Sequence, residues 1–125
     1  MSLLSLLCLL LLPSPTVDTS GPAVEWLTPL EQDLGDLVRK QPVSIEFHYR
    51  NTGNEPLVID NVRPSCGCTA PDWSFEPVAP DSTGLITIRY DAKKPGYFRK
   101  KVKVYFHGIR KAQVIWLEGW VEELD

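Results

Sequence analysis

Apolar and polar side chains alternate with a period of two along three stretches of the chain. Residues 43–50 show the most regular alternation, and residues 86–90 and 98–106 repeat it. Successive side chains of a β-strand point to opposite faces, so this period predicts strands with one buried face. The side chains expected to point inward are Val43, Ile45, Phe47, Tyr49, Ile86, Ile88, Tyr90, Val102, Val104 and Phe106.

Residues 31–38 form a segment whose charges are spaced as in a helix. Gly35 lies in its middle, and Pro29 and Pro42 flank it. Glycine destabilises a helix interior and proline interrupts it. We therefore expect an extended, kinked segment here.

Shorter apolar runs at residues 24–27, 57–62 and 112–121 predict three further strands. Residues 69–75 are expected to form a short irregular piece. The eleven prolines suit strands joined by turns better than they suit helices. About seven short strands with frequent turns and no helix predict an all-β fold, an antiparallel β-sandwich of two sheets.

The stretch from Asn51 to Thr69 contains a marked turn and a pair of cysteines. Asn51, Gly53 and Asn54 tolerate positive φ angles. Pro56 cannot donate a hydrogen bond to a strand ladder, so the chain is expected to reverse before it in a hairpin turn.

Cys66, Gly67 and Cys68 follow the strand at 57–62, which residues 63–65 are expected to end. A rigid strand end can present the side chains of the next loop to solvent. Whatever chemistry the domain carries is therefore predicted at this rim.

Residues 1–20 differ from the rest of the chain. Leu3–Leu12 is nearly pure leucine and is followed by a small polar run. The leucine run is too short to span a bilayer and no stop-transfer pattern follows it, which predicts a signal peptide at residues 1–20. Cys8 lacks the small neighbours of a lipidation site. The mature domain is expected at residues 24–125, secreted or periplasmic and without a membrane span.

The composition is that of one globular domain, with 43% hydrophobic and 23% charged residues in a chain of 125. The formal net charge of -3 at pH 7 gives no general attraction to nucleic acid or to anionic membranes. Neither is predicted as a partner.

Taken together, these motifs resemble a family of bacterial exported proteins, the domain of unknown function 1573. The residues that carry the resemblance are Asn51-Thr-Gly-Asn-x-Pro-Leu57, Ser65-Cys-Gly-Cys-Thr69, Tyr90-Asp91 with Lys94-Pro95-Gly96, and Gly119-x-Val121. An upstream Asp-Phe-Gly signature of the family stands here as Asp33-Leu34-Gly35. The resemblance covers residues 24–121 and implies an immunoglobulin-like sandwich similar to the domains of pilus chaperones and of sperm-protein-like cilium proteins. It implies no activity.

Cys66 and Cys68 admit three interpretations. Export favours oxidation, and a disulfide across one glycine is expected to hold its Cα atoms near the upper limit of bridging distance, which would make it a labile redox site. Two thiolates could instead bind a soft metal. Copper(I) suits such a pair because it accepts few ligands, whereas zinc would need His48 and His107 as well. The third interpretation is structural, a small buried pair or a brace of the turn.

Other chemistry-bearing residues have simpler explanations. His48 falls on the polar side of its strand and His107 in a turn, so both are expected at the surface. Seven of the thirteen basic residues lie between Arg89 and Lys103. This strip could bind phosphates or an acidic partner, but a solvated hairpin whose lysines discourage edge pairing is the simpler interpretation. The sequence has no motif of hydrolytic catalysis, so no catalytic residue is predicted.

A small core needs fewer tryptophans than the chain has at Trp73, Trp116 and Trp120. An exposed tryptophan among them would mark a partner surface. The favoured hypothesis is a non-enzymatic module of the bacterial cell envelope that holds an unidentified protein partner by a sheet edge or face. The alternative is a thiol redox or copper-handling protein that uses Cys66 and Cys68.

Overall fold

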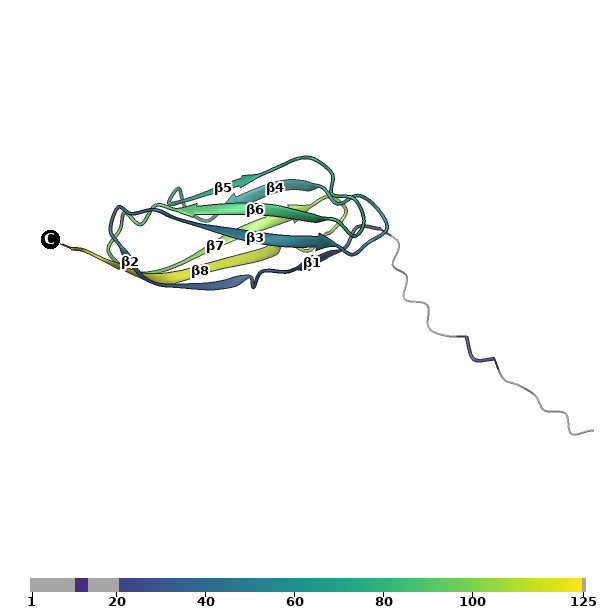
Figure 1. The fold of residues 1–125 in the computed structure, drawn as a ribbon, viewed down its shortest axis with the longest axis horizontal. Coiled ribbons are helices and arrows are strands. Elements are labelled where there is room, and N and C mark those ends of the chain that lie inside the picture. Colours follow the sequence, from purple (N-terminus) through teal and green to yellow (C-terminus); the bar gives the residue numbers. More distant parts are fainter. Residues whose placement is uncertain (1–10, 14–20, 125) are drawn as a thin grey trace, which may run out of the picture.

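Two four-stranded sheets, with no helix, make up the part of the chain that the computed structural model describes, residues 11–13 and 21–124. The strands are β1 (Val24–Trp26), β2 (Glu31–Val38), β3 (Val43–Asn51), β4 (Ile59–Pro64), β5 (Thr69–Trp73), β6 (Thr83–Tyr90), β7 (Gly96–Phe106) and β8 (Gln113–Glu122). One sheet has the order β1-β3-β6-β5 and the other β2-β8-β7-β4. The strands run along the long axis of the molecule (Figure 1). The predicted all-β sandwich is confirmed.

The first two strands divide one N-terminal segment between the two sheets. β1 pairs with β3 in one sheet, and β2 then pairs with β8 in the other. The β2–β8 pair is parallel, whereas all other strand pairs in the described residues are antiparallel. Gly35 has a φ of 67°, and the register of β2 shifts between Asp33 and Asp36. The expected extended, kinked segment is confirmed.

The alternating residues form the core between the sheets. Phe47, Ile86, Ile88, Val102 and Val104 are each 0% exposed. The outer strands contribute partly buried side chains that pack on them, among them Trp26, Leu34 and Leu37. The inward faces predicted for residues 43–50, 86–90 and 98–106 are therefore confirmed, with Val43 and Ile45 only partly buried.

The prediction of a hairpin after β3 is wrong, because β3 and β4 belong to different sheets. Asn51, Gly53 and Asn54 do not adopt positive φ. The connection instead depends on the fully buried side chain of Asn51. Its Nδ2 donates to the carbonyls of Glu55 (2.7 Å) and Val78 (2.9 Å), and its Oδ1 accepts from the Gly53 amide (2.9 Å). Three hydrogen bonds of one amide side chain thus stabilise the connection between the two sheets.

Residues 69–75 are also more regular than predicted, because Thr69–Trp73 forms strand β5. Among the described strands, β5 pairs with β6 alone and is an edge strand. Its Pro71 lacks the N–H that a central strand would need, but an edge strand tolerates it. The sandwich therefore has one strand more than the expected seven in the described residues.

The predicted signal peptide lies almost entirely outside the described residues. Leu11 and Leu12, which belong to it, are exposed. In the described part of the chain, no helix has the length and apolar character needed to cross a membrane.

Candidate functional site at the cysteine end of the sandwich

Three loops meet at one end of the sandwich, which we call the cysteine end. They are residues 39–42 between β2 and β3, residues 65–68 between β4 and β5, and residues 91–95 between β6 and β7. In Figure 1 this end is the one that also carries the C-terminus. The prediction that Cys66 and Cys68 lie just beyond a strand end is confirmed.

Backbone hydrogen bonds tie these loops to one another. The Asp91 amide donates to the Cys68 carbonyl (3.0 Å), and the Lys40 amide donates to the Ala92 carbonyl (2.9 Å). Lys40 and Ala92 both have positive φ, at 65° and 54°. The Asp91 Oδ1 accepts from the Lys93 amide (3.1 Å). The backbones of the three loops are therefore held together in one arrangement.

Cys66 and Cys68 are joined by a disulfide, and both are half-buried. Their Cα atoms lie 5.3 Å apart, well within the range usual for disulfides and not near its limit as expected. A bonded sulfur is not a thiolate, so this state of the pair has no metal-ligating thiolates. Among the described residues, no three His, Cys, Asp or Glu side chains are grouped so that they could hold a metal ion.

The two histidines lie apart from the cysteines. His48 is exposed on β3, with its Nε2 3.4 Å from the Glu46 carboxylate. His107 is exposed in the turn after β7, with its Nδ1 3.4 Å from the Asp60 carboxylate. The structure therefore does not bring either of them to the disulfide.

Two hollows flank the cysteine loop. The first, about 290 Å³, is lined by Cys66, Cys68, Tyr90, Asp91, Lys93, Lys94, Tyr97 and Lys100. The second, about 390 Å³, is lined by Lys40, Pro42, Gly67, Cys68, Ala70, Arg89, Asp91 and Lys93. Five basic side chains line the two hollows, and Asp91 is the one acidic side chain among these lining residues. The cysteine end is consequently rich in positive charge.

Tyr90 forms a neutral wall of the first hollow. Its ring stacks on Phe98 with the centroids 4.3 Å apart. Burial, and then the negative charge of Asp91, raise the pKa of the Tyr90 phenol above its usual value of 10.0. It therefore keeps its proton at physiological pH.

Lys100 occupies an inward-facing position of β7. Phe98 and Val102, two residues before and after it, are buried, and so is its cross-strand partner Leu117. Lys100 itself is half-buried and lines the first hollow. A lysine is rarely placed inward unless its ammonium group can reach water or a partner, and the hollow beside Lys100 offers that access.

The basic strip from Arg89 to Lys103 does not protect a sheet edge as interpreted from the sequence. β7 lies between β8 and β4, so it is a central strand. Arg99, Lys101 and Lys103 lie on the outer face of this sheet, opposite Glu118, Trp116 and Val114. The remaining basic residues of the strip gather at the cysteine end; they are Arg89, Lys93, Lys94 and Lys100.

Aromatic side chains cover part of the same outer face, and we call this region the aromatic face (Tyr97, Trp116 and Trp120). Tyr97 and Trp120 are direct cross-strand partners and are 60% and 51% exposed. Trp116 is half-buried beneath Arg99, whose guanidinium carbon lies 4.4 Å from the ring centroid. Arg99 is also within 2.8 Å of the Glu118 carboxylate and 3.6 Å of the Glu31 carboxylate.

Tyr97 connects the aromatic face with the cysteine end. It lines the first hollow there and also a hollow of about 290 Å³ beside Asp33, Asp36 and Trp120. Its hydroxyl donates to Glu118 Oε1 (2.8 Å). This hydrogen bond, more than the partial burial and the negative charge of Glu118, raises the pKa of Tyr97 above its usual 10.0.

Trp73 is not part of the aromatic face, because it lies on β5 in the other sheet. It is half-buried against Phe75, with the ring centroids 5.6 Å apart. Its buried Nε1 finds no hydrogen-bond acceptor in the described residues. The three tryptophans predicted as partner surface thus do not form one surface.

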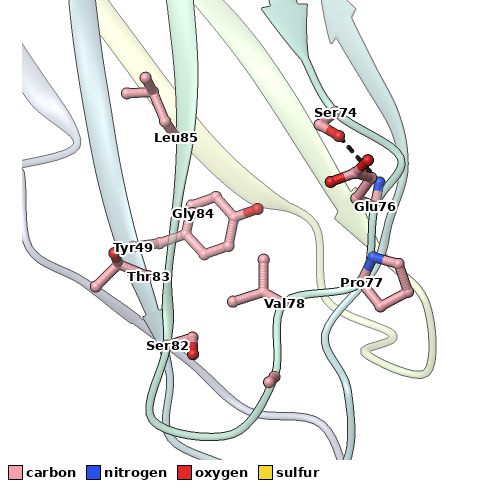
Figure 2. A pocket seen from close by; sticks show the side chains of 10 residues that line it. Tyr49, Ser74, Glu76, Pro77, Val78, Ser82, Thr83, Gly84 and Leu85 are labelled. Atoms are coloured by element: carbon pink, nitrogen blue, oxygen red, sulfur yellow. Dashed lines mark hydrogen bonds between the residues drawn. The ribbon is translucent and has the colours of Figure 1, made fainter.

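A further hollow, of about 380 Å³, lies at the opposite end of the sandwich and was not predicted from the sequence. Figure 2 shows the ring of Tyr49 beside Gly84, with its hydroxyl directed toward the loop of Glu76 and Val78. Burial raises the pKa of the Tyr49 phenol. The residues around this hollow form no nucleophile and base pair, and the Ser74 hydroxyl only accepts a hydrogen bond from the Glu76 amide (3.0 Å).

Solved structures share this fold at low sequence identity. A protein of unknown function from Porphyromonas gingivalis W83 matches with a TM-score of 0.69 and 15% identity, over 82% of this chain and 48% of that one. This chain therefore spans about half the length of that protein. The ASH / PapD-like domain 7 of human CEP192 matches with a TM-score of 0.66 and 12% identity, over 91% and 95% of the two chains. SSP-19 of Caenorhabditis elegans, an MSP-domain protein like family member, matches with a TM-score of 0.54 and 17% identity, over 69% and 94%.

These similarities place the fold among immunoglobulin-like and PapD-like sandwiches, as the resemblance implied. A search of curated proteins found no match. The model of one protein family matches residues 26–121, which include the cysteine pair and all of β3 to β7. The chain belongs to the family described as "Protein of unknown function (DUF1573)".

Proposed function

We propose that the protein is a non-enzymatic module of the bacterial cell envelope that binds a protein partner through the aromatic face. The observation that carries this proposal is the exposed cross-strand pair of Tyr97 and Trp120. Large aromatic side chains that remain in water on a rigid central part of a sheet are typical of binding hot spots.

The charged residues around Tyr97 and Trp120 indicate which charge the partner carries at the interface. The hollow beside Trp120 is lined by the carboxylate-bearing residues Asp33, Asp36 and Glu118. Arg99 approaches Glu118, whereas Asp36 has no ion-pair partner within 4.0 Å in the described residues. A lysine or arginine of the partner would find a carboxylate and an indole face side by side here. We therefore propose a partner with an exposed basic segment.

Site-specific photo-crosslinking in envelope extracts tests this surface. A photoreactive residue at position 120 is expected to give one dominant crosslinked protein, and the Asp36→Lys substitution is expected to abolish that product. The matched control places the same residue at Leu85, which is 40% exposed on the other sheet. Equal crosslinking from positions 85 and 120 would rule out the aromatic face as the binding surface.

Direct binding gives the second measurement once that protein is purified. Trp120→Ala is expected to weaken its affinity by about tenfold or more, because truncated hot-spot residues typically cost at least 2 kcal/mol of binding energy. Phe75→Ala, which removes a 66% exposed aromatic side chain from the other sheet, is expected to leave the affinity unchanged. The reverse order of effects would contradict the proposal.

Export is part of the proposal and rests on the leucine-rich start of the chain. Cell fractionation of the full-length protein is expected to place it in the periplasm or medium, shortened by cleavage near residue 20. Replacing two leucines of Leu3–Leu12 by aspartate is expected to hold the protein in the cytoplasm at its full mass. A cytoplasmic location of the unaltered protein would refute export.

A second candidate function, thiol redox or copper handling, is favoured by the setting of the disulfide. The pair is half-buried beside Lys93, Lys94 and Lys100. Nearby ammonium groups favour a thiolate over a thiol, which makes cysteines reactive and metal-binding when reduced. Mass measurement with and without alkylation, together with elemental analysis of the purified protein, distinguishes a bonded, free or metallated pair. A bonded pair that resists dithiothreitol in the folded protein would exclude this candidate.

A further inference from the structure

The basic residues of the cysteine end come from four segments that converge on the cysteine loop. Lys40 follows β2, Arg89 is the last residue but one of β6, and Lys93 and Lys94 lie in the loop before β7. Lys100 is added from inside β7 itself. Lys40 is far from the other four in the sequence, and those four are divided among β6, the loop before β7 and β7 itself, so a run of charge along one solvated strand does not explain their convergence.

These five side chains have no ion-pair partner within 4.0 Å in the described residues. Other surface lysines share that property, and the convergence on two adjoining hollows is what separates this group from them. Asp91, the one carboxylate in the linings, already accepts a hydrogen bond from the Lys93 amide. The field in the hollows is therefore positive and only partly neutralised.

The supporting backbone is ordered before anything binds. Gly96, at the start of β7, has a φ of 103°, and Ala92 lies in the left-handed region at 54°. The Arg39 Nε donates to the Lys93 carbonyl (3.1 Å), and the Ser65 amide donates to the Lys101 carbonyl (3.0 Å). A loop whose backbone is already ordered loses less entropy on binding than a mobile loop.

From this geometry we infer that the cysteine end binds a small organic anion, whose carboxylate or phosphate group is held by Lys93, Lys94 and Lys100. The first hollow, about 290 Å³, is close to the lower end of the size range of small-molecule sites. The Tyr97 ring, the disulfide and the neutral Tyr90 give it apolar walls for the organic part. This site shares Tyr97 with the proposed partner surface, but the lysines that hold the anion are not part of that surface, so the inference does not depend on the partner proposal.

Titration of the intact protein with four probes tests the inference by amide chemical shifts in NMR. The probes are phenyl phosphate, phenylacetate, inorganic phosphate and benzyl alcohol, so that charge and organic part are varied separately. Phenyl phosphate or phenylacetate is expected to bind most tightly, with the largest shifts at residues 66–68 and 91–96. The tighter of the two identifies the head group. If neither binds more tightly than benzyl alcohol, or if the shifts spread over the outer face of β7, the inference is wrong.

Charge-removing variants identify the lysines that act. The double substitution Lys93→Gln and Lys100→Gln is expected to raise the dissociation constant of phenyl phosphate by about tenfold or more, the effect of losing charge-assisted hydrogen bonds. Lys103→Gln on the outer face of the same strand removes a similar charge and is expected to change it less than about twofold. Equal weakening by the control would show only a general field effect and overturn the site.

Lys94→Gln provides a check that does not disturb the interior, because Lys94 is exposed in the loop before β7. It is expected to weaken phenyl phosphate binding by about threefold to tenfold while the melting temperature stays unchanged. Unchanged binding in this variant, together with unchanged binding in any folded Lys100→Gln protein, would refute the inference.

Discussion

At one end of the sandwich, which we call the Asn51 end, the buried Asn51 side chain makes three hydrogen bonds to the backbone of neighbouring loops. At the cysteine end, five basic side chains line open hollows without ion-pair partners in the described residues. Both ends consist of loops joined by backbone hydrogen bonds. At the Asn51 end the polar side chain stabilises the fold, whereas at the cysteine end the basic side chains are available to bind a ligand.

This difference separates residues that maintain the sandwich from residues that can act. A buried amide whose hydrogen bonds are all internal has nothing left to offer a partner. Unpaired ammonium groups around a hollow contribute little to stability, since exposed charges are well solvated. Substitutions at the Asn51 end should therefore lower stability, whereas those at the cysteine end should change binding or redox behaviour and leave the fold intact.

The largest effect is expected from Asn51→Ala. It removes both donors and the acceptor of a fully buried side chain, so the free energy of unfolding should fall by about 2–4 kcal/mol. Urea unfolding followed by tryptophan fluorescence measures it. The matched control is Asn54→Ala in the same loop, where an exposed side chain accepts one hydrogen bond from the Gly21 amide (2.7 Å). An equal loss of unfolding free energy in the two variants would show that the buried Asn51 side chain stabilises the fold no more than the exposed Asn54 side chain.

Two glycines, one near each end, give the next contrast. A Cβ at Gly84 would lie 2.3 Å from Tyr49 Cζ, whereas a Cβ at Gly67 would meet no atom within 4 Å. Gly84→Ala should therefore cost about 1–3 kcal/mol through overpacking. Gly67→Ala should be close to neutral, because Gly67 does not adopt positive φ. Thermal unfolding of both variants checks this, and a larger loss at Gly67 would contradict the comparison.

The sandwich was predictable because two-residue alternation depends only on which face of a strand is buried. The Asn51 connection was not, since its conformation comes from a long-range hydrogen bond to Val78 and not from local turn preferences. β5 was missed because Pro71 disfavours a strand unless the strand is known to lie at an edge. Strand order also depends on pairing between distant segments. The order shows that β7 is a central strand, so its lysines do not protect a sheet edge.

The placement of Cys66 and Cys68 beyond a strand end was predictable from the sequence. The convergence of Lys40 and Lys100 on that pair could not be read from the sequence, because they come from separate segments brought together by the topology. The basic strip from Arg89 to Lys103 was a sequence signal for four of the five residues, and Lys100 carried a second one. It interrupts the apolar positions of an otherwise regular alternation between Phe98 and Val102.

Reduction of the disulfide should have a smaller effect than the loss of Asn51. The bond closes a loop of only three residues, so the loop-entropy estimate of its stabilisation is about 1–2 kcal/mol. Urea unfolding with and without dithiothreitol measures this difference, and the Cys66→Ser, Cys68→Ser double variant should match the reduced protein. Unfolding of the reduced protein without urea would show that the pair is a structural brace, and that the cysteine end serves the fold as the Asn51 end does.

The smallest effect concerns the hydrogen bond from Tyr97 to Glu118 beside the first hollow of the cysteine end. This bond favours the neutral phenol, so the pKa of Tyr97 is higher in the folded protein than in the unfolded chain, where it is about 10. Its contribution to stability is therefore complete below pH 10 and is lost as the pH rises through the folded pKa. Glu118→Gln removes the negative charge and the charged acceptor and should lower the pKa of Tyr97 toward 10, as measured by NMR of tyrosine labelled at Cζ. Because Tyr97 is mostly exposed, the melting temperature at pH 7 should hardly change, and a clear drop would mean that this contact maintains the fold.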